Sequence, residues 1–160
     1  MLFNVHRARE AAHKSGSMVV TEGYMDAIAV HQSGIRNVVA ALGTAASKGT
    51  LLFTQCWGIA AESPATPVLL VFTGAAAAQA PFLGFAQRSA RRAVGGYVLV
   101  DPVLPRPGAV SDWPDAPVTV IVTPAADEDT RSAALGARLR GWEVLEGDAS
   151  ALIADIAGRP

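Results

Sequence analysis

The sequence predicts a three-layer α/β domain, in which a mostly parallel sheet of about five to six strands is covered by helices on both faces. Two observations support this fold class. Short apolar runs alternate along the chain with segments whose apolar residues have helical spacing. One of these runs, 68–72, is apolar at every position, which is typical of a strand buried on both faces. With 160 residues, the chain is long enough for one domain with a hydrophobic core.

The first third of the chain already shows this alternation. Helices are expected where apolar residues recur every three or four positions, and strands where apolar residues run together. Gly34 suits the end of a helix, because glycine adopts the left-handed conformation found there. In order, we expect a helix over 2–14, a strand over 18–21, a helix over 24–33, a strand over 37–42 and a helix over 45–57.

The rest of the chain continues the pattern after Pro64 and Pro67. Pro81 is expected in or near the first turns of an alanine-rich helix, where its missing N–H is tolerated. In order, we expect a strand over 68–72, a helix over 75–93, a strand over 97–100, a loop with five prolines over 102–117, a strand over 118–122, a helix over 127–140, a strand over 142–145 and a helix over 149–157.

The composition predicts a globular domain outside a membrane. The chain is 51% hydrophobic and 17% charged, and no stretch reaches the roughly 20 uncharged apolar residues of a membrane span. No signal peptide is visible, because charged residues fall where its apolar core belongs. The single cysteine, Cys56, cannot form an internal disulfide, so the cytoplasm is the expected location. With a net charge of −1, any binding to nucleic acid needs a local basic patch.

One carboxylate stands at the end of an early strand. Glu22 follows the strand expected over 18–21, Gly23 provides a turn, and Asp26 lies in the first turns of the next helix. This arrangement holds an acid at the carboxyl end of a strand, where open α/β sheets build their sites. Considered alone, Glu22 and Asp26 also fit a simpler interpretation, in which acids near a helix N-terminus interact favourably with the helix dipole.

The motifs around Glu22 resemble the Toprim domain of bacterial DnaG-type DNA primases. The resemblance covers about residues 2–53, and its motifs agree in order and spacing as well as in residue type. The matching segments read LF at 2–3, HRAR at 6–9, VVTEGYMD at 19–26, HQSGI at 31–35 and AALGTA at 40–45.

This resemblance implies phosphoryl chemistry beside a divalent metal ion, with Mg²⁺ as the cofactor and single-stranded DNA or RNA as the partner. It assigns Glu22 to catalysis and metal binding. Asp26 lies four residues on and could share a face of the turn-to-helix segment with Glu22, so it is the second candidate for both roles. Gly43 and Thr44 are the candidate substrate-binding residues of the matching AALGTA segment. Carboxylates suit this chemistry because they hold a metal ion or move a proton while charge develops on phosphate oxygens.

A small basic group lies on the first expected helix. Arg7, Arg9 and Lys14, together with His13, could contact the phosphates of a nucleic acid, so we treat the first three as candidate substrate-binding residues. The alternative interpretation is an ordinary solvated helix face.

The second half of the chain departs from the Toprim pattern. Primases carry an Asp-x-Asp motif after their third strand, and the matching place here reads FTGAAAA over 72–78. Thr73 and Ala75 stand where the two aspartates are expected. Because Mg²⁺ is bound mainly through carboxylates and water, the sequence predicts poor metal binding and impaired activity.

From about 67 to 152 the chain instead resembles the C-terminal half of an α/β-hydrolase, without that family's catalytic residues. The nucleophile position of its Gly-x-Ser-x-Gly turn falls on Gly74, and no histidine follows His31. Cys56 is a conceivable nucleophile, although a lone buried cysteine also fits. Asp101, at the end of a strand, fits either a site acid or a turn residue. The matching segments read VLLVFTGAA at 68–76, GYVLVDPVLP at 96–105, WPDAPVTV at 113–120 and RGWEV at 140–144.

The two resemblances together predict a single composite domain over 1–160. A Toprim-like segment over 1–56 and an α/β-hydrolase-like segment over 67–160 share one sheet, or one half is poorly ordered. The first functional hypothesis is a primase-type Toprim protein or remnant, whose metal-dependent nucleotidyl or phosphoryl transfer on nucleic acid is impaired. The alternative is a catalytically inactive hydrolase-like binding or interaction module. A residual hydrolase with an unrecognised nucleophile is the third hypothesis.

Overall fold

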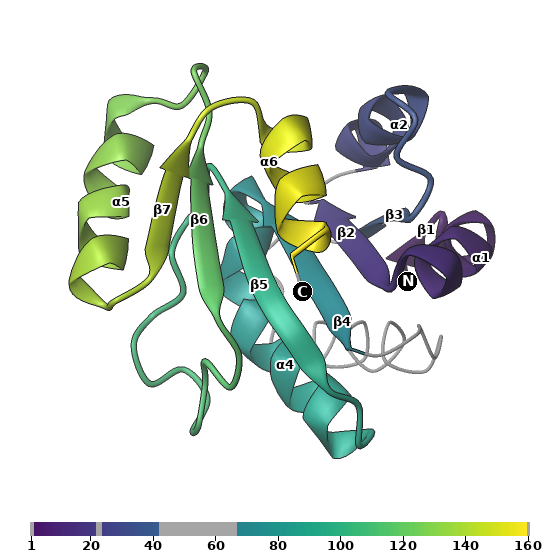
Figure 1. Cartoon of the computed structure of the whole chain (residues 1–160), viewed down its shortest axis with the longest axis horizontal. Coiled ribbons are helices and arrows are strands. Elements are labelled where there is room, and N and C mark those ends of the chain that lie inside the picture. The colour runs from purple at the N-terminus through teal and green to yellow at the C-terminus, as the bar shows by residue number, and fades with distance from the viewer. Residues whose placement is uncertain (1, 22–23, 42–66, 160) are drawn as a thin grey trace.

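The computed structural model describes residues 2–21, 24–41 and 67–159, and it confirms the predicted α/β fold (Figure 1). Strands and helices alternate along the chain, and the strands form one sheet with helices on both faces. In chain order the described elements are β1 (Leu2–Phe3), α1 (Val5–Ser15), β2 (Ser17–Thr21), α2 (Tyr24–Gln32), β3 (Val38–Ala41), β4 (Val68–Thr73), the 3₁₀ helix η1 (Gly74–Gln79), α4 (Ala80–Ser89), β5 (Val94–Val100), β6 (Val118–Val122), α5 (Glu128–Leu139), β7 (Glu143–Glu146) and α6 (Ala149–Ala157).

The described sheet has seven strands in the order β1-β3-β2-β4-β5-β6-β7. All strands from β3 to β7 in this order run parallel, as predicted. β1 adds a short antiparallel strand at the edge, where Leu2 pairs with Ala41 and Phe3 with Ala40. Segments from both resemblances contribute to the same sheet, because β2 pairs directly with β4.

The expected helix over 2–14 is wrong at its start, because its first residues belong to β1. Asn4 makes the turn into α1 with a φ of 68°, a left-handed conformation that asparagine tolerates better than most residues. Its side-chain Nδ2 donates to the carbonyl of Val38 at 2.9 Å. A strand of two residues is too short to produce a recognisable pattern, so the sequence could not predict it.

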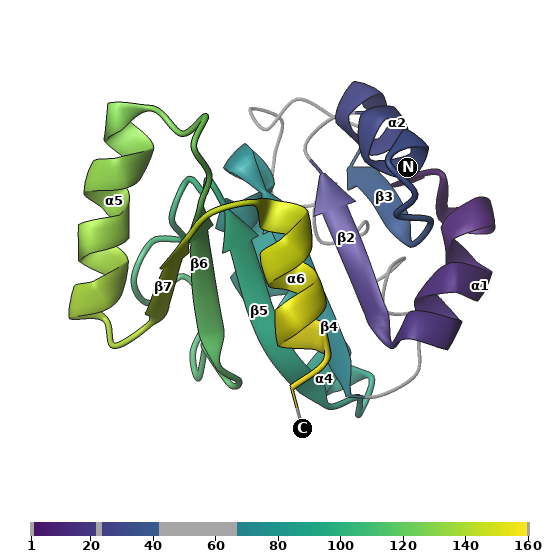
Figure 2. The same cartoon turned by 45° about the horizontal axis from the view of Figure 1, so that its top comes forward.

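Different helices cover the two faces of the sheet (Figures 1 and 2). Residues of α1, α4 and α5 pack in one hydrophobic cluster, and residues of α2 and α6 pack in the other. β4 contributes to both clusters, since Leu70 and Phe72 belong to the first and Val71 to the second, each at most 1% exposed. Successive side chains of a strand point to opposite faces, so β4 is buried on both faces, as its apolar run predicts.

The helix expected over 75–93 is divided in two. Residues Gly74–Gln79 form η1, and α4 begins afterwards with Pro81 in its first turn, where a missing N–H costs no hydrogen bond. The next strand, β5, also begins earlier than expected, at Val94. The sequence does not indicate this start, because Gly95 and Gly96 follow Val94 and glycine has low strand propensity. Glycine suits this start of the strand, because a Cβ at Gly95 would make a tight contact of 3.2 Å with the Cβ of Pro67.

The proline-rich loop over 102–117 is fastened to α4 and β5 by polar and aromatic contacts. Tyr97 is 1% exposed, and its hydroxyl donates to Oδ1 of Asp115 at 2.6 Å. Arg88 lies 3.5 Å from the other oxygen of the same carboxylate. Trp113 packs edge-on against Tyr97 with ring centroids 5.5 Å apart. Tyr97 therefore joins the buried face of the sheet to the loop.

Burial and the hydrogen bond to Asp115 raise the pKa of Tyr97 far above its ordinary value. The folded state therefore holds this proton more tightly than the unfolded state, in which the tyrosine pKa is about 10. The contribution of this group to the free energy of unfolding is therefore complete below about pH 10. It is lost as the pH rises further, by up to about 1.4 kcal/mol per pH unit. Urea denaturation across this range should show the loss, and the Tyr97→Phe variant should lack it. Equal slopes in the two proteins would contradict this prediction.

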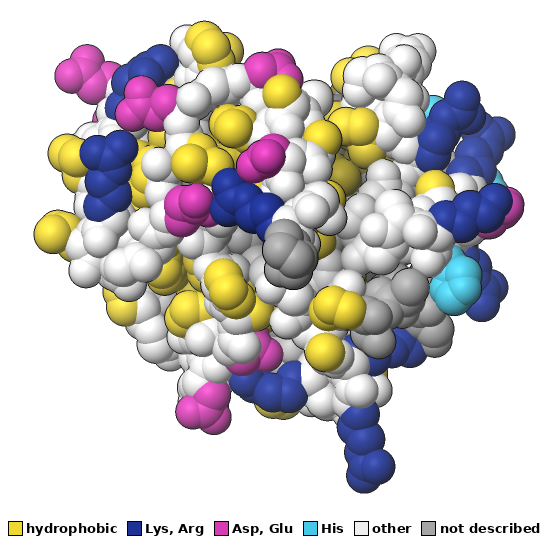
Figure 3. All heavy atoms as spheres, viewed as in Figure 1, with side chains coloured by type: hydrophobic (Ala, Val, Ile, Leu, Met, Phe, Trp, Pro, Cys, Tyr) yellow, Lys and Arg dark blue, Asp and Glu magenta, His cyan; other side chains and the backbone are white. Residues whose placement is uncertain are grey.

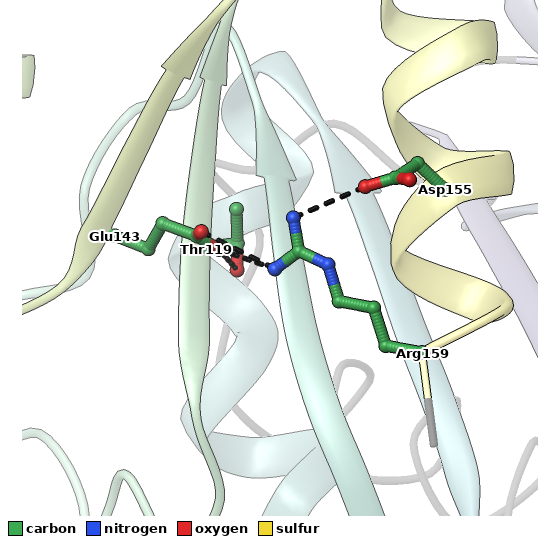
Figure 4. Close-up of polar contacts among 4 residues, drawn as sticks. All are labelled: Thr119, Glu143, Asp155 and Arg159. Atoms are coloured by element: carbon green, nitrogen blue, oxygen red, sulfur yellow. Dashed lines mark hydrogen bonds and ion pairs between the residues drawn. The ribbon is translucent and has the colours of Figure 1, made fainter.

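The C-terminal helix α6 is held across the sheet by Arg159 (Figure 4). Its guanidinium donates to Glu143 of β7 at 3.0 Å and to Asp155 of α6 at 3.2 Å. Thr119 of β6 donates to the same Glu143 carboxylate at 2.8 Å. Because the charged groups are partly exposed, water screens each ion pair, and its contribution to stability is small.

Candidate functional site at the carboxyl edge of the sheet

The sheet contains a switch point between β2 and β4. From β2 the chain passes to β3 on one side, whereas β4 pairs with β2 on the other side. In open α/β sheets such a point leaves a crevice outside the carboxyl ends of the two strands, and ligands bind there. Val20 of β2 pairs with Phe72 of β4, and each strand ends one residue later, so both end at the same level.

The residues next to the switch point are those that the Toprim resemblance selects. β2 ends at Thr21, which is fully buried and donates its hydroxyl to the carbonyl of Val39 at 3.4 Å. Glu22 is the next residue in the sequence and lies outside the described residues, as does Gly23. At the end of β4, Thr73 and Ala75 are both half-buried, and neither has an ionisable group.

The other carboxylates at the ends of the parallel strands have structural partners. Asp101 follows β5 with a φ of 43°, and its two carboxylate oxygens accept from the backbone N–H of Thr123 at 2.8 Å and from its hydroxyl at 2.6 Å. Asp148 follows β7 and caps α6 by accepting from the N–H of Ala151 at 2.9 Å. Asp101 therefore ties the end of β5 to the loop after β6, and nothing in the sequence points to Thr123 as its partner.

The described residues do not fit a Mg²⁺ site. Mg²⁺ requires several oxygen ligands, usually including carboxylates. No group of three or more Asp, Glu, His or Cys residues in the described part of the chain is arranged to hold a metal ion. At the switch point itself, the described side chains contribute no carboxylate, because Thr73 and Ala75 occupy the end of β4.

The other predicted site residues lie on helices or outside the described part. Asp26 belongs to α2. Gly43, Thr44 and Cys56 lie outside the described residues. The predicted site over Glu22, Asp26, Gly43 and Thr44 thus remains a prediction.

The predicted basic residues are all exposed on α1, but they do not all lie at the switch point. α1 leads directly into the amino end of β2, so Lys14 in its last turn lies at the amino edge of the sheet. Lys14 donates to Glu10 at 2.6 Å, and this contact raises the pKa of Lys14 and lowers that of Glu10. Arg7 and Arg9 lie nearer the other end of the helix.

Gly74 makes a sharp turn directly after β4. Its φ is 55°, in the left-handed region that favours glycine, and the chain continues into η1. The carbonyl of Gly74 accepts from the N–H of Val103 at 3.0 Å. Strand β4, the turn at Gly74 and the 3₁₀ helix η1 follow one another directly, and the residue at the turn has no side chain.

The matching family model is that of the Toprim domain, and it covers residues 16–59. Curated DNA primases match the same part of the chain. The primase of Helicobacter pylori is 47% identical over 45 residues, which are 28% of this chain and 8% of the primase. The primase of Synechococcus elongatus is 50% identical over 48 residues, which are 30% of this chain and 7% of that protein. The matched segment thus spans less than a tenth of these relatives and confirms the N-terminal resemblance alone.

Two solved structures are also similar. The Aquifex aeolicus primase, with its zinc-binding and RNA polymerase domains, has a TM-score of 0.43 and 26% identity, covering 66% of this chain and 24% of that one. A proposed carboxylesterase from Lactobacillus plantarum has a TM-score of 0.46 and 11% identity, covering 88% and 79%. Both TM-scores are low. Within the described residues, no helix is long and apolar enough to cross a membrane.

Proposed function

We propose that this chain is a primase-type Toprim protein, or a remnant of one, that acts on nucleic acid and whose metal-dependent nucleotidyl or phosphoryl transfer is impaired. One observation supports the proposal above the others. The segment that matches the Toprim model includes β2, and β2 ends at the switch point of the sheet with Glu22 as the next residue. A strand that delivers an acid to a switch point has the arrangement that binding sites of open α/β sheets require.

Impairment follows from the neighbouring strand. β4 ends beside β2, and its last residue and the turn after it provide Thr73, Gly74 and Ala75 in place of carboxylates. One acid from Glu22, with Asp26 nearby in the sequence, offers fewer charged oxygens than Mg²⁺ prefers. We therefore infer weak binding of Mg²⁺ and slow phosphoryl transfer.

Nucleic acid is the proposed partner for two reasons. The curated relatives of the matched segment are DNA primases. The exposed Arg7 and Arg9 on α1 provide positive charge that suits phosphates, although the net charge of the whole chain is −1. The contacts would be local and would weaken with added salt.

The proposal predicts that metal binding is weak and depends on Glu22. In a titration followed by NMR, the signals of the backbone amides around Glu22 should shift with Mg²⁺ or broaden with Mn²⁺, with a dissociation constant of about a few millimolar. The Glu22→Gln variant keeps the size of the side chain and removes its charge, so its amides should not respond. No change in the wild-type spectrum at millimolar metal would contradict the proposal.

A second candidate function is a catalytically inactive hydrolase-like binding module. The observation that favours it is the left-handed turn at Gly74 between β4 and η1, which has the position of a nucleophile turn but no nucleophile. This candidate predicts no turnover of an activated ester. Turnover that survives purification and replacement of Cys56 would indicate a residual hydrolase instead.

A further inference from the structure

Helix α5 lies at the border of the molecule, beside β7 (Figures 1 and 2). Its inward side is buried, since Ala134 and Ala137 are at most 7% exposed and belong to the first hydrophobic cluster. On the outward side, Leu135 is 60% exposed and Leu139 is 91% exposed. A surface helix normally carries polar residues on this side. The packing of α5 on the sheet therefore does not account for the two leucines.

The two leucines belong to one stripe along α5. At about 100° per residue, Glu128, Ser132, Leu135 and Leu139 lie within about 60° of one another around the helix, on the side away from the sheet. Figure 3 shows hydrophobic side chains on the left-hand border of the molecule, where α5 lies in Figure 1, with acidic side chains toward the end at which the helix begins.

The start of α5 is negatively charged. Asp127 caps the helix by accepting from the N–H of Thr130 at 2.8 Å. Glu128 and Asp129 are exposed, and neither forms an ion pair within the described residues. The nearby Arg131 donates to backbone carbonyls of the turn before the helix. Three acids thus stand against one arginine at this end.

The other end of α5 is positively charged. Arg138 lies 3.7 Å from Glu146 of β7, and both side chains are more than half exposed, so water screens this pair. Arg140 donates to the carbonyl of Pro105 at 3.0 Å, and its guanidinium lies 5.0 Å from the ring centre of Trp142. Both partners of Arg140 are uncharged, so this end has two arginines against one acid.

We propose that α5 is an interface for a second copy of this chain, which docks with its own α5 antiparallel to the first. A two-fold axis then passes near the middle of the helix, and Leu135 contacts Leu135 of the second copy. The acidic start of each helix lies beside the basic end of the other. On the two flanks of the stripe, Arg138 faces Glu128 of the second copy and Arg140 faces its Asp129. A parallel arrangement would instead bring like charges together.

Self-complementarity favours a second copy over a different partner. One surface supplies both the apolar stripe and the two opposite charges, as a two-fold contact requires. A helix of 12 residues offers a small contact area, and small interfaces are weak, so we expect a dissociation constant of about 0.1 mM. α5 packs on β6 and β7, whereas the switch point lies between β2 and β4. Dimerisation would therefore leave the switch point open in both copies, and the proposal does not depend on the proposed function.

The first test removes the apolar stripe. Sedimentation equilibrium of the wild type at up to about 0.5 mM should show a monomer–dimer equilibrium. Leu135→Gln with Leu139→Gln should weaken it about tenfold or more, because both leucines lose their burial in the dimer. The matched control, Met25→Gln with Val103→Thr, changes two exposed apolar residues outside α5 and should behave like the wild type. Circular dichroism checks that each variant is folded.

The second test exchanges the charges. Arg138→Glu makes both ends of α5 acidic, and Glu128→Arg with Asp129→Arg makes both ends basic. Each variant alone should dimerise about tenfold more weakly than the wild type at low salt, because like charges meet at both ends. An equimolar mixture should recover the wild-type affinity, since the acidic ends of one variant then face the basic ends of the other. A loss of folding in either variant could not produce this recovery.

Three results would overturn the proposal. The first is a wild type that stays monomeric at about 0.5 mM, including one that binds phospholipid vesicles through α5 instead. The second is a dimer that the leucine variant leaves unchanged, because the contact would then lie elsewhere. The third is a mixture of the charge variants that associates no better than each variant alone. None of these results depends on the metal titration of Glu22.

Discussion

Replacing Gly84 by alanine is expected to lower the free energy of unfolding by about 3 kcal/mol or more. A Cβ at this position of α4 would lie 2.0 Å from the hydroxyl oxygen of Tyr97 and 3.3 Å from Cδ1 of Trp113. The tyrosine cannot easily move away, because its hydroxyl donates to Asp115 at 2.6 Å and its ring is buried. Urea denaturation followed by circular dichroism measures the loss.

Gly136 provides the matched control for this substitution. It also lies within a helix, α5, but nothing lies within 4 Å of a Cβ built on it. Gly136→Ala should therefore stabilise the protein by about 0.5–1 kcal/mol, the usual gain for alanine over glycine in a helix. If Gly84→Ala does not fold, adding Tyr97→Phe removes the colliding oxygen and should recover part of the stability. Similar effects of alanine at positions 84 and 136 would contradict this account of the packing.

The parallel strands could be predicted from the sequence because their signals are local. The run over 68–72 is apolar throughout, and β6 consists of five buried residues, so each strand indicates its own burial. β1 and the start of β5 could not be predicted in the same way. β1 depends on pairing with β3. The second and third residues of β5 are glycines, where a Cβ would lie 3.2 Å from the Cβ of Pro67 or from Cδ1 of Leu69, and these neighbours are not evident from the sequence.

Only part of the candidate site could be predicted from the sequence. Glu22 and Thr73 each come directly after an expected strand, so the sequence predicts that both lie at strand ends. The pairing of β2 with β4, which brings these two ends together, could not be predicted. Long-range pairing of this kind has no signature in a single sequence.

Restoring the two missing acids is expected to create a metal site. The double substitution Thr73→Asp with Ala75→Asp places carboxylates after β4, next to the end of β2. Both positions are half-buried, so the new carboxylates would keep contact with water. Together with Glu22 they would supply three acids, and we expect Mn²⁺ or Mg²⁺ to bind at least about tenfold more tightly than to the wild type.

The new acids bring a cost and need a control. Aspartate has low strand propensity and the carboxylates repel one another without metal, so we expect the double variant to lose about 1 kcal/mol of stability, which added metal restores. Thr73→Asn with Ala75→Asn has the same shape without the charge. This control should lose similar stability and gain no affinity for metal. A gain in the asparagine variant would show that the effect does not come from the carboxylates.

The central claim is that Glu22 is the surviving part of a metal site at the switch point between β2 and β4. Its most direct test is the Mn²⁺ affinity of the Thr73→Asp, Ala75→Asp protein with and without Glu22→Gln, measured by calorimetry. The account predicts that the double variant binds Mn²⁺ and that the added Glu22→Gln substitution weakens this binding by about tenfold or more. Equal affinity with glutamate and glutamine at position 22 would contradict it, because the new aspartates would then bind metal without Glu22.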